Sequence, residues 1–459
     1  MEGHHVRGSR HSRLPYFLIA AMAGSLSGGP AFADPLRFLT TREAVDSNQL
    51  SERVSRVPAR DRALAALREE GGQVSAALRR LVEPFDAEAR EIWAARGVSA
   101  HLSDGEVAQI AAEWPSVEVE TLADTAEPVV AHEMLSARAA QPAWNHVMSG
   151  AWDLARLRNL TGKGVLIGVV GPDVPFDHTA IAGRIAHRRV FGAPSLPPAR
   201  SDRAIEDLML LHPLGILAGR MPDATKSLGA APEASIALAT VPRGKIDADA
   251  LLEAIQWLTE PADGVRPAAI LFAVDFQGPA PRAVRDALSA CRTAGILPIL
   301  PAGNNPSRVT GMAALPDVVT VGALDQWRSR ASFSGCGPAV VDGYPVNKPD
   351  YMEPGLAVLG PASGNTFKQG SGTLQAAAHL AGLWAQIRQS KPDADLETLL
   401  PCLLATSRDL GPTGADAEYG SGIPDPLAML QYHENPVPPG TPPTYPPPAT
   451  ATVPLPGGF

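Results

Sequence analysis

The sequence predicts an α/β fold: a doubly wound, mainly parallel sheet with helices on both faces, preceded by a small α+β domain. Short, continuously apolar runs recur from residue 165 onward, which is typical of strands that are buried on both faces. These runs are VLIGVV, SIALATV, AAILFAV, ILPIL and VVTVGAL. Helical patterns lie between several of them, as at 247–260 and 281–295. Because strands that alternate with helices form parallel sheets, the doubly wound architecture follows.

The residues from 61 to 130 show a different pattern and are expected to form the small α+β domain. Apolar residues recur at helical spacing over 61–81, interrupted by a Gly-Gly pair, and alternate as in a strand over 98–102. The sequence Ser-Asp-Gly-Glu at 103–106 is a capping box that opens a second helix. A unit of this size is consistent with a compact accessory domain.

The two ends of the chain predict segments outside these domains. Three arginines, an apolar run from Pro15 to Gly24 and small residues before Asp34 form a secretory signal peptide over 1–33. We therefore expect export to the periplasm or the extracellular space. Residues 34–60 are expected to be an irregular leader and 131–160 a linker. The proline-rich segment 431–459 is expected to be an extended, disordered tail.

Composition narrows the classes of partner. The chain has 459 residues and a net charge of −9, which gives no reason to expect nucleic acid. No run after the signal peptide reaches the roughly 20 apolar residues that cross a bilayer, so no membrane span is expected in the mature chain. The sequence does not determine which of Cys291, Cys336 and Cys402 form a disulfide, and none of them has the spacing of a metal site. No cofactor is indicated, and a structural calcium ion is not specified by the sequence.

Six motifs follow one another in an order that resembles the subtilases, the subtilisin-like serine peptidase family (peptidase family S8). They are GKGVLIGVV, GAAPEASIALATV, PAGNN, KPDYMEPG, GSGTLQAAAHLAG and YGSGIPDPLAML. The segment GVSAHLSDGEVAQIAAEWPSVEVE resembles the inhibitory propeptide domain of that family. The resemblance implies a subtilase domain over 161–430 and a propeptide-like domain over 61–130.

The catalytic positions of the family fall on residues of the wrong chemistry. Counting along the matched motifs places the aspartate at Gly171, the histidine at Pro213 and the serine at Leu374. The asparagine of the oxyanion loop is kept as Asn304. Acyl transfer needs a nucleophile, a base to take its proton and an acid to orient the base. Glycine, proline and leucine supply none of these groups, so no catalytic residue is expected at the three positions.

Neighbouring residues offer one alternative, a relocated triad of Asp173, His212 and Ser371. His212 is one residue before the family position, which on a helix means about 100° of rotation away from the site. Asp173 lies about 6–7 Å further along its strand. Ser371 precedes the helix start and would lose the helix-dipole support at that end. Three compatible shifts would be needed together.

Two functional hypotheses result. The first is an exported, non-catalytic pseudopeptidase that binds a peptide or protein. The second is an active serine-type endopeptidase whose triad is relocated. Active family members remove their propeptide domain by self-cleavage, so an inert chain should keep it. If the propeptide-like domain packs as in the family, its final strand near Val129 and Val130 lies toward the substrate cleft and restricts access.

Overall fold

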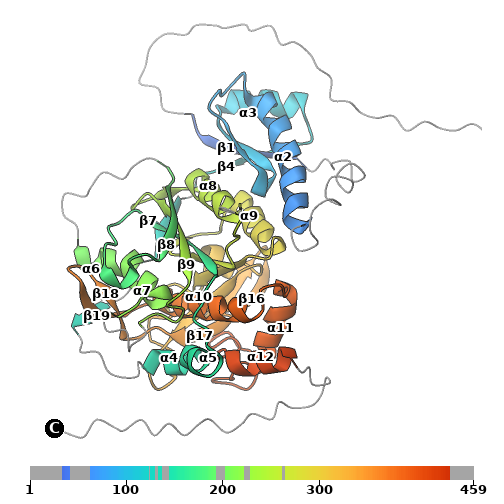
Figure 1. Ribbon diagram of the computed structural model, residues 1–459. Coiled ribbons are helices and arrows are strands. Elements are labelled where there is room, and N and C mark those ends of the chain that lie inside the picture. Colours follow the sequence, from blue (N-terminus) through green and yellow to red (C-terminus); the bar gives the residue numbers. More distant parts are fainter. Residues whose placement is uncertain are drawn as a thin grey trace, which may run out of the picture. The chain divides into compact units, whose positions relative to one another are not determined.

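The computed structural model describes residues 34–41, 62–123, 125–129, 133–136, 144–192, 202–221, 228–260 and 264–434. The predicted signal peptide, the predicted leader after residue 41 and the proline-rich tail after residue 434 lie outside the described residues. From Pro35 onward the described residues belong to one compact unit. Figure 1 colours them from blue to red along the chain.

The larger part of the chain is built on a seven-stranded sheet in which every neighbouring pair of strands is parallel. All five apolar runs predicted as strands lie in it, which confirms the predicted architecture. Across the sheet the order is β17 (Tyr351–Pro354), β14 (Val319–Leu324), β13 (Leu297–Pro301), β11 (Ala269–Phe272), β7 (Leu166–Pro172), β9 (Ser235–Val241) and β8 (Ile185–Val190).

Both faces of this sheet are covered because successive strand residues point to opposite sides. In β7, Ile167 and Val169 enter one core cluster, whereas Leu166 and Val170 enter the other. The first cluster includes residues of α5 (Ala151–Arg158), α7 (His212–Ala218), α10 (Thr373–Ser390), α11 (Leu396–Thr406) and α12 (Pro426–Glu434). The second includes residues of α8 (Ala248–Thr259) and α9 (Arg282–Thr293), and Figure 1 shows the helices against the sheet.

The small domain has a four-stranded antiparallel sheet in the order β2-β3-β1-β4. Its elements are β1 (Leu36–Thr41), α2 (Arg62–Val82), β2 (Arg90–Ile92), η2 (Trp93–Ala95), β3 (Gly97–His101), α3 (Asp104–Glu113) and β4 (Val117–Thr121). The capping box at the start of α3 is present, with the Ser103 N–H donating to Glu106 at 2.8 Å. Helix α2 is not interrupted at its Gly-Gly pair. A Cβ atom on Gly71 would lie 2.1 Å from the Trp93 carbonyl oxygen, so the glycine allows a close approach of two backbones.

The prediction of an irregular leader was wrong for residues 36–41, which form β1 in the centre of this sheet. Phe38 and Leu39 point to opposite faces of β1, and both are buried, in different core clusters. The strand is short and polar residues follow it in the sequence, so its pattern did not separate it from the leader.

The prediction of a linker over 131–160 was also wrong for its described residues. They contain β6 (Glu133–Ser136), α4 (Trp144–Met148) and α5. The Asn145 side-chain amide lies 2.8 Å from Nε2 of His379 in α10, and Leu154 of α5 is part of the main core. Because these helices are only five and eight residues long, they show too little periodicity to be predicted.

No helix in the described ranges has both the length and the apolar character needed to cross a bilayer.

Two carboxylates connect the small domain to the larger one. One lies in the first turn of α8, and the other contacts the first turn of α9. Asp249 in α8 accepts hydrogen bonds from Arg90 at 2.6 Å and from the Ser99 hydroxyl. Glu120 of β4 accepts from the backbone N–H groups of Arg282 and Ala283, at 2.9 and 3.2 Å. The first N–H groups of a helix have no partner within the helix and carry partial positive charge. Glu120 therefore caps α9 from another domain.

Replacing Glu120 with alanine should lower the free energy of unfolding by about 1–2 kcal/mol, because two helix N–H groups lose their acceptor. Urea denaturation followed by circular dichroism measures the change. Glu88→Ala is the matched control, since the Glu88 side chain is exposed in the loop between α2 and β2. Equal stability of the two variants would show that the cap contributes nothing.

Candidate functional site

The positions that the resemblance assigns to the catalytic residues lie where β7 ends and where α7 and α10 begin. Both helices pack on one another, and α10 also packs on β7. Gly171 is in β7, Pro213 is in the first turn of α7 and Leu374 is in the first turn of α10. All three residues are buried. The site thus has the location expected in an open α/β sheet, at the carboxyl ends of the strands.

Hydrocarbon fills this site. A Cβ atom added to Gly171 would lie 2.8 Å from Cδ1 of Leu210, so the space beside the strand is already occupied. Leu374 is 0% exposed and belongs to the same core cluster as Leu210. A buried apolar cluster therefore includes Leu374 and also Leu210, the neighbour of Gly171.

Leu210 lies in an unusual helical segment beside the site. Residues Asp207–Leu211 form η4, a π-helical segment that runs directly into α7. Such segments are rare, and they are frequent at functional sites. Here Leu208, Leu210 and Leu211 are all buried. No pattern in the sequence indicated this segment, because its residues are as apolar as those of an ordinary core helix.

His212, the base of the relocated triad, is fully buried against the hairpin of β18 (Val358–Ala362) and β19 (Thr366–Ser371). Its Nε2 atom lies 3.3 Å from the Lys368 carbonyl oxygen. Cβ atoms on Gly360 and Gly370 would lie 2.6 and 2.8 Å from the imidazole ring, so both glycines make room for it. Burial lowers the pKa of His212 to about 4, which keeps the ring neutral at physiological pH.

The other two members of that triad have partners elsewhere. The Asp173 carboxylate forms an ion pair with Arg188 at 2.9 Å. The Ser371 hydroxyl oxygen accepts the backbone N–H of Ala357 at 3.0 Å. Among the three described candidates, each side chain is thus bonded to a different element and none to another candidate.

Asn304 follows β13 and contacts the start of α10. Its Oδ1 atom accepts the backbone N–H and the hydroxyl of Thr373, both at 3.0 Å. The first N–H groups of a helix need such acceptors. Asn304 therefore has a structural contact beside Leu374, in addition to its place in the oxyanion motif.

One segment of the chain crosses the site region. We call residues 125–136 the crossing segment. Its first part, β5 (Thr125–Pro128), lies antiparallel between β10 (Ile246–Asp247) and β12 (Val274–Phe276). Its last part, β6, pairs antiparallel with β19, and Glu133 lies opposite Ser371. Residues 130–132 between the two parts lie outside the described residues.

Val129 directly follows β5, and its N–H donates to the Ala273 carbonyl at 2.8 Å. Val130 is outside the described residues. The crossing segment therefore pairs with strands on both sides of the site. On one side it pairs with β19 as far as Ser371, three residues before Leu374, and on the other side it pairs with β12.

Two carboxyl groups near the site, the half-buried Asp275 and the buried Glu353, were missed by the sequence analysis. Asp275 of β12 accepts the backbone N–H groups of Phe276, Met312 and Ala313, at 2.7, 2.6 and 3.3 Å. It thereby fixes the start of η5 (Gly311–Ala314). Burial raises the pKa of Asp275 to about 7, although the three N–H groups favour the charged form.

Glu353 of β17 is 0% exposed, and neither carboxyl oxygen has a hydrogen-bond partner among the described residues. Burial raises the pKa of Glu353 well above its ordinary value. It lies two residues before Gly355, whose carbonyl accepts the Gly372 N–H at 2.8 Å just before α10. No spacing in the sequence distinguishes such an acid from an exposed one.

The fold and the position of the site define a doubly wound α/β protein whose candidate site lies at the carboxyl edge of its sheet. Comparison with known families gives a match to Peptidase S8, the subtilase family, over residues 162–422. Since this match covers more than half of the chain, the protein belongs to the subtilase family.

Relatives agree with this assignment. The chain is 29% identical over 299 residues to the subtilisin-like protease PopC of Myxococcus xanthus, covering 59% of this chain and 61% of PopC. It is 28% identical over 233 residues to Bacillopeptidase F of Bacillus subtilis, covering 46% of this chain and 16% of that protein. It is 26% identical over 279 residues to subtilisin DY of Bacillus licheniformis, covering 59% of this chain and 92% of the relative. The match thus spans less than two thirds of PopC and of Bacillopeptidase F.

Leu374→Ala should lower the free energy of unfolding by about 2–5 kcal/mol, the cost of a cavity in a packed core. Leu404→Ala is the matched control, because Leu404 is 53% exposed on α11. Urea denaturation of both variants measures the difference. If Leu374→Ala is no less stable than the control, the site is an open pocket and not part of the core.

The raised pKa of Asp275 predicts a pH dependence of stability. Between about pH 4 and 7 the folded protein holds this proton, whereas the unfolded chain has released it. This group therefore makes the free energy of unfolding fall as pH rises through that range, by at most about 1.4 kcal/mol per pH unit. Asp275→Asn should remove that part of the slope and should be more stable than the parent at pH 8. Parallel profiles for the two proteins would contradict the assignment.

Proposed function

We propose that this protein is an exported subtilase-fold protein without peptidase activity that acts by binding a peptide or another protein. The observation that carries the proposal is the buried apolar cluster of Leu210 and Leu374 beside Gly171. The proposed export depends on the signal-peptide pattern over residues 1–33.

Chemistry supports the absence of catalysis. A subtilase cleaves peptides with a hydroxyl nucleophile whose proton passes to an oriented imidazole. Here the nucleophile position, Leu374, carries a hydrocarbon side chain. The imidazole next to the family's histidine position, that of His212, faces the Lys368 carbonyl. Oxyanion stabilisation and binding alone leave only about 10³–10⁴-fold catalysis over water in a related enzyme, as measured for subtilisin.

The crossing segment supports a binding role of a particular kind. It shows that an extended chain can lie antiparallel to β12 and to β19 in this protein. Main-chain pairing of this type gives affinity for extended peptides, and the side-chain pockets give specificity. A ligand for the same strands would have to displace the crossing segment, whereas a partner on the outer surface would not.

The alternative is an active serine-type endopeptidase with the relocated triad of Asp173, His212 and Ser371. Their present contacts, with Arg188, Lys368 and Ala357, would all have to change together. This requirement favours the non-catalytic proposal.

Retention of the small domain tests the proposal. Expressed alone and exported, the chain should begin near Asp34 and remain covalently intact through residue 160, because it lacks the means to cut itself. Intact-mass spectrometry of the purified protein measures this directly. The matched control is Ser371→Ala, which should also remain intact, with a mass lower only by the oxygen atom that the substitution removes. Removal of the small domain by the parent chain, abolished in Ser371→Ala, would establish the relocated triad.

A further inference from the structure

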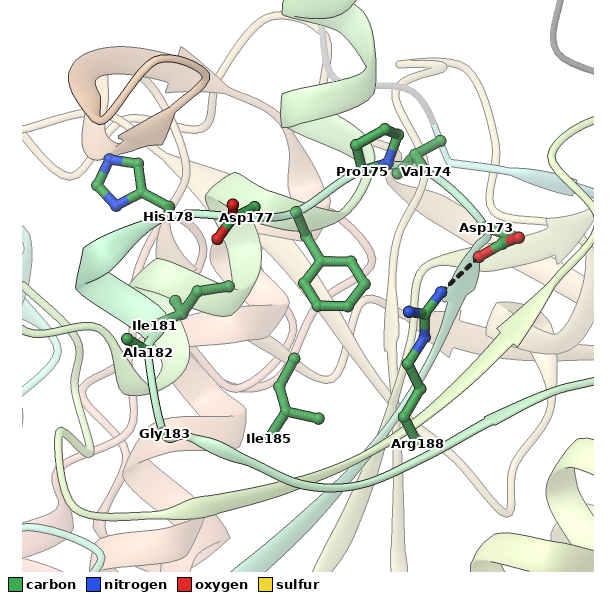
Figure 2. A pocket seen from close by; sticks show the side chains of 11 residues that line it. Asp173, Val174, Pro175, Asp177, His178, Ile181, Ala182, Gly183, Ile185 and Arg188 are labelled. Atoms are coloured by element: carbon green, nitrogen blue, oxygen red, sulfur yellow. Dashed lines mark hydrogen bonds and ion pairs between the residues drawn. The ribbon is translucent and has the colours of Figure 1, made fainter.

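A hollow of about 570 Å³ lies beside the site, and the described residues that line it all come from one stretch of chain, from Asp173 after β7 to Arg188 in β8. Its apolar lining includes Val174, Ile181 and Ile185, and Figure 2 shows these side chains around it. The crossing segment pairs with β10, β12 and β19, and none of its described residues lines the hollow. The hollow is thus accessible while that segment is in place.

The hollow already holds one cation of the protein itself. The Arg188 guanidinium lies 2.9 Å from the Asp173 carboxylate and 5.0 Å from the centre of the Phe176 ring. A carboxylate combined with an aromatic face is a favourable environment for a guanidinium group, which is planar and weakly hydrated. This pair occupies one end of the hollow, as the dashed line in Figure 2 marks.

A second carboxylate lines the hollow without such a partner. Asp177 is exposed, and it has no cationic partner among the described residues. Its neighbour His178 does not neutralise it: the ring accepts the Ala180 N–H at 2.9 Å and donates to the Thr366 carbonyl at 3.0 Å. Burial, the largest effect, lowers the pKa of His178, although the carboxylates of Asp207 and Asp177 act in the opposite direction. Figure 2 shows Asp173 and Asp177 at separate ends of the hollow.

We propose that this hollow binds an arginine side chain presented by a peptide or protein partner. Asp177 supplies the counter-ion, and Ile181 and Ile185 contact the methylene stem, which is the apolar part of an arginine side chain. A carboxylate ligand is disfavoured, because it would face Asp177 and would have to displace Asp173 from Arg188. The site is separate from the strands paired with the crossing segment, so it does not depend on the cleft-binding proposal.

The probe is the peptide acetyl-Gly-Arg-Gly-amide, titrated into the full-length protein with isoleucine methyl groups labelled for NMR. We expect saturable shifts of the Ile181 and Ile185 methyl signals, and no such shifts with acetyl-Gly-Gln-Gly-amide. Asp177→Asn should weaken binding by about three- to fivefold, the size expected of an exposed ion pair. High salt should weaken binding to the parent protein in the same direction.

Asp247→Asn is the matched control, since Asp247 is also exposed but lies on β10 outside the hollow. It should bind the arginine peptide as the parent does. Equal shifts with the glutamine peptide, or unchanged affinity in Asp177→Asn, would overturn the proposal. Methyl spectra of the free variants show whether each is folded. A negative result leaves the mass measurement of the small domain unaffected, so the two proposals fail independently.

Discussion

The packing of hydrocarbon at the start of α10 is the constraint on which the account of this protein depends. In a subtilase fold the end of β7 and the first turns of two helices meet at the carboxyl edge of the sheet, where polar groups could cooperate. Here Leu374 and Leu210 belong to one buried core cluster, and a Cβ atom on Gly171 would lie 2.8 Å from Cδ1 of Leu210. Leu210 belongs to the π-helical segment η4. In the proposed function, these apolar contacts take the place of the polar contacts that catalysis requires.

The small domain and the crossing segment are both connected to the larger domain. Glu120 and Asp249 connect that domain to the first turns of α9 and α8. The crossing segment then continues the chain through strand pairing on both sides of the site. A domain that is joined by the Glu120 cap on α9, by the contacts of Asp249 with Arg90 and Ser99, and by strand pairing is part of the folded unit. In our account it remains there as a covalent part of the protein and restricts the cleft.

Much of this could be predicted from the sequence because strands buried on both faces and ordered glycine motifs leave strong patterns. The parallel sheet and the start of α3 were predicted in this way, and the assignment of Gly171, Pro213 and Leu374 to the catalytic positions stays a prediction. The strand β1 and the helices α4 and α5 were not, since short elements show too little periodicity. Asp275 and Glu353 were missed because their burial is set by distant parts of the chain. The π-helical segment η4 has no sequence signature at all.

The central claim is that the site cannot form an acyl intermediate, and the most direct test is reaction with a fluorophosphonate probe. The purified full-length protein should remain unlabelled under conditions that fully label an active subtilisin, and its incubation with casein should release no peptides. A stoichiometric adduct mapped to Ser371, accompanied by casein hydrolysis that the probe abolishes, would contradict the account.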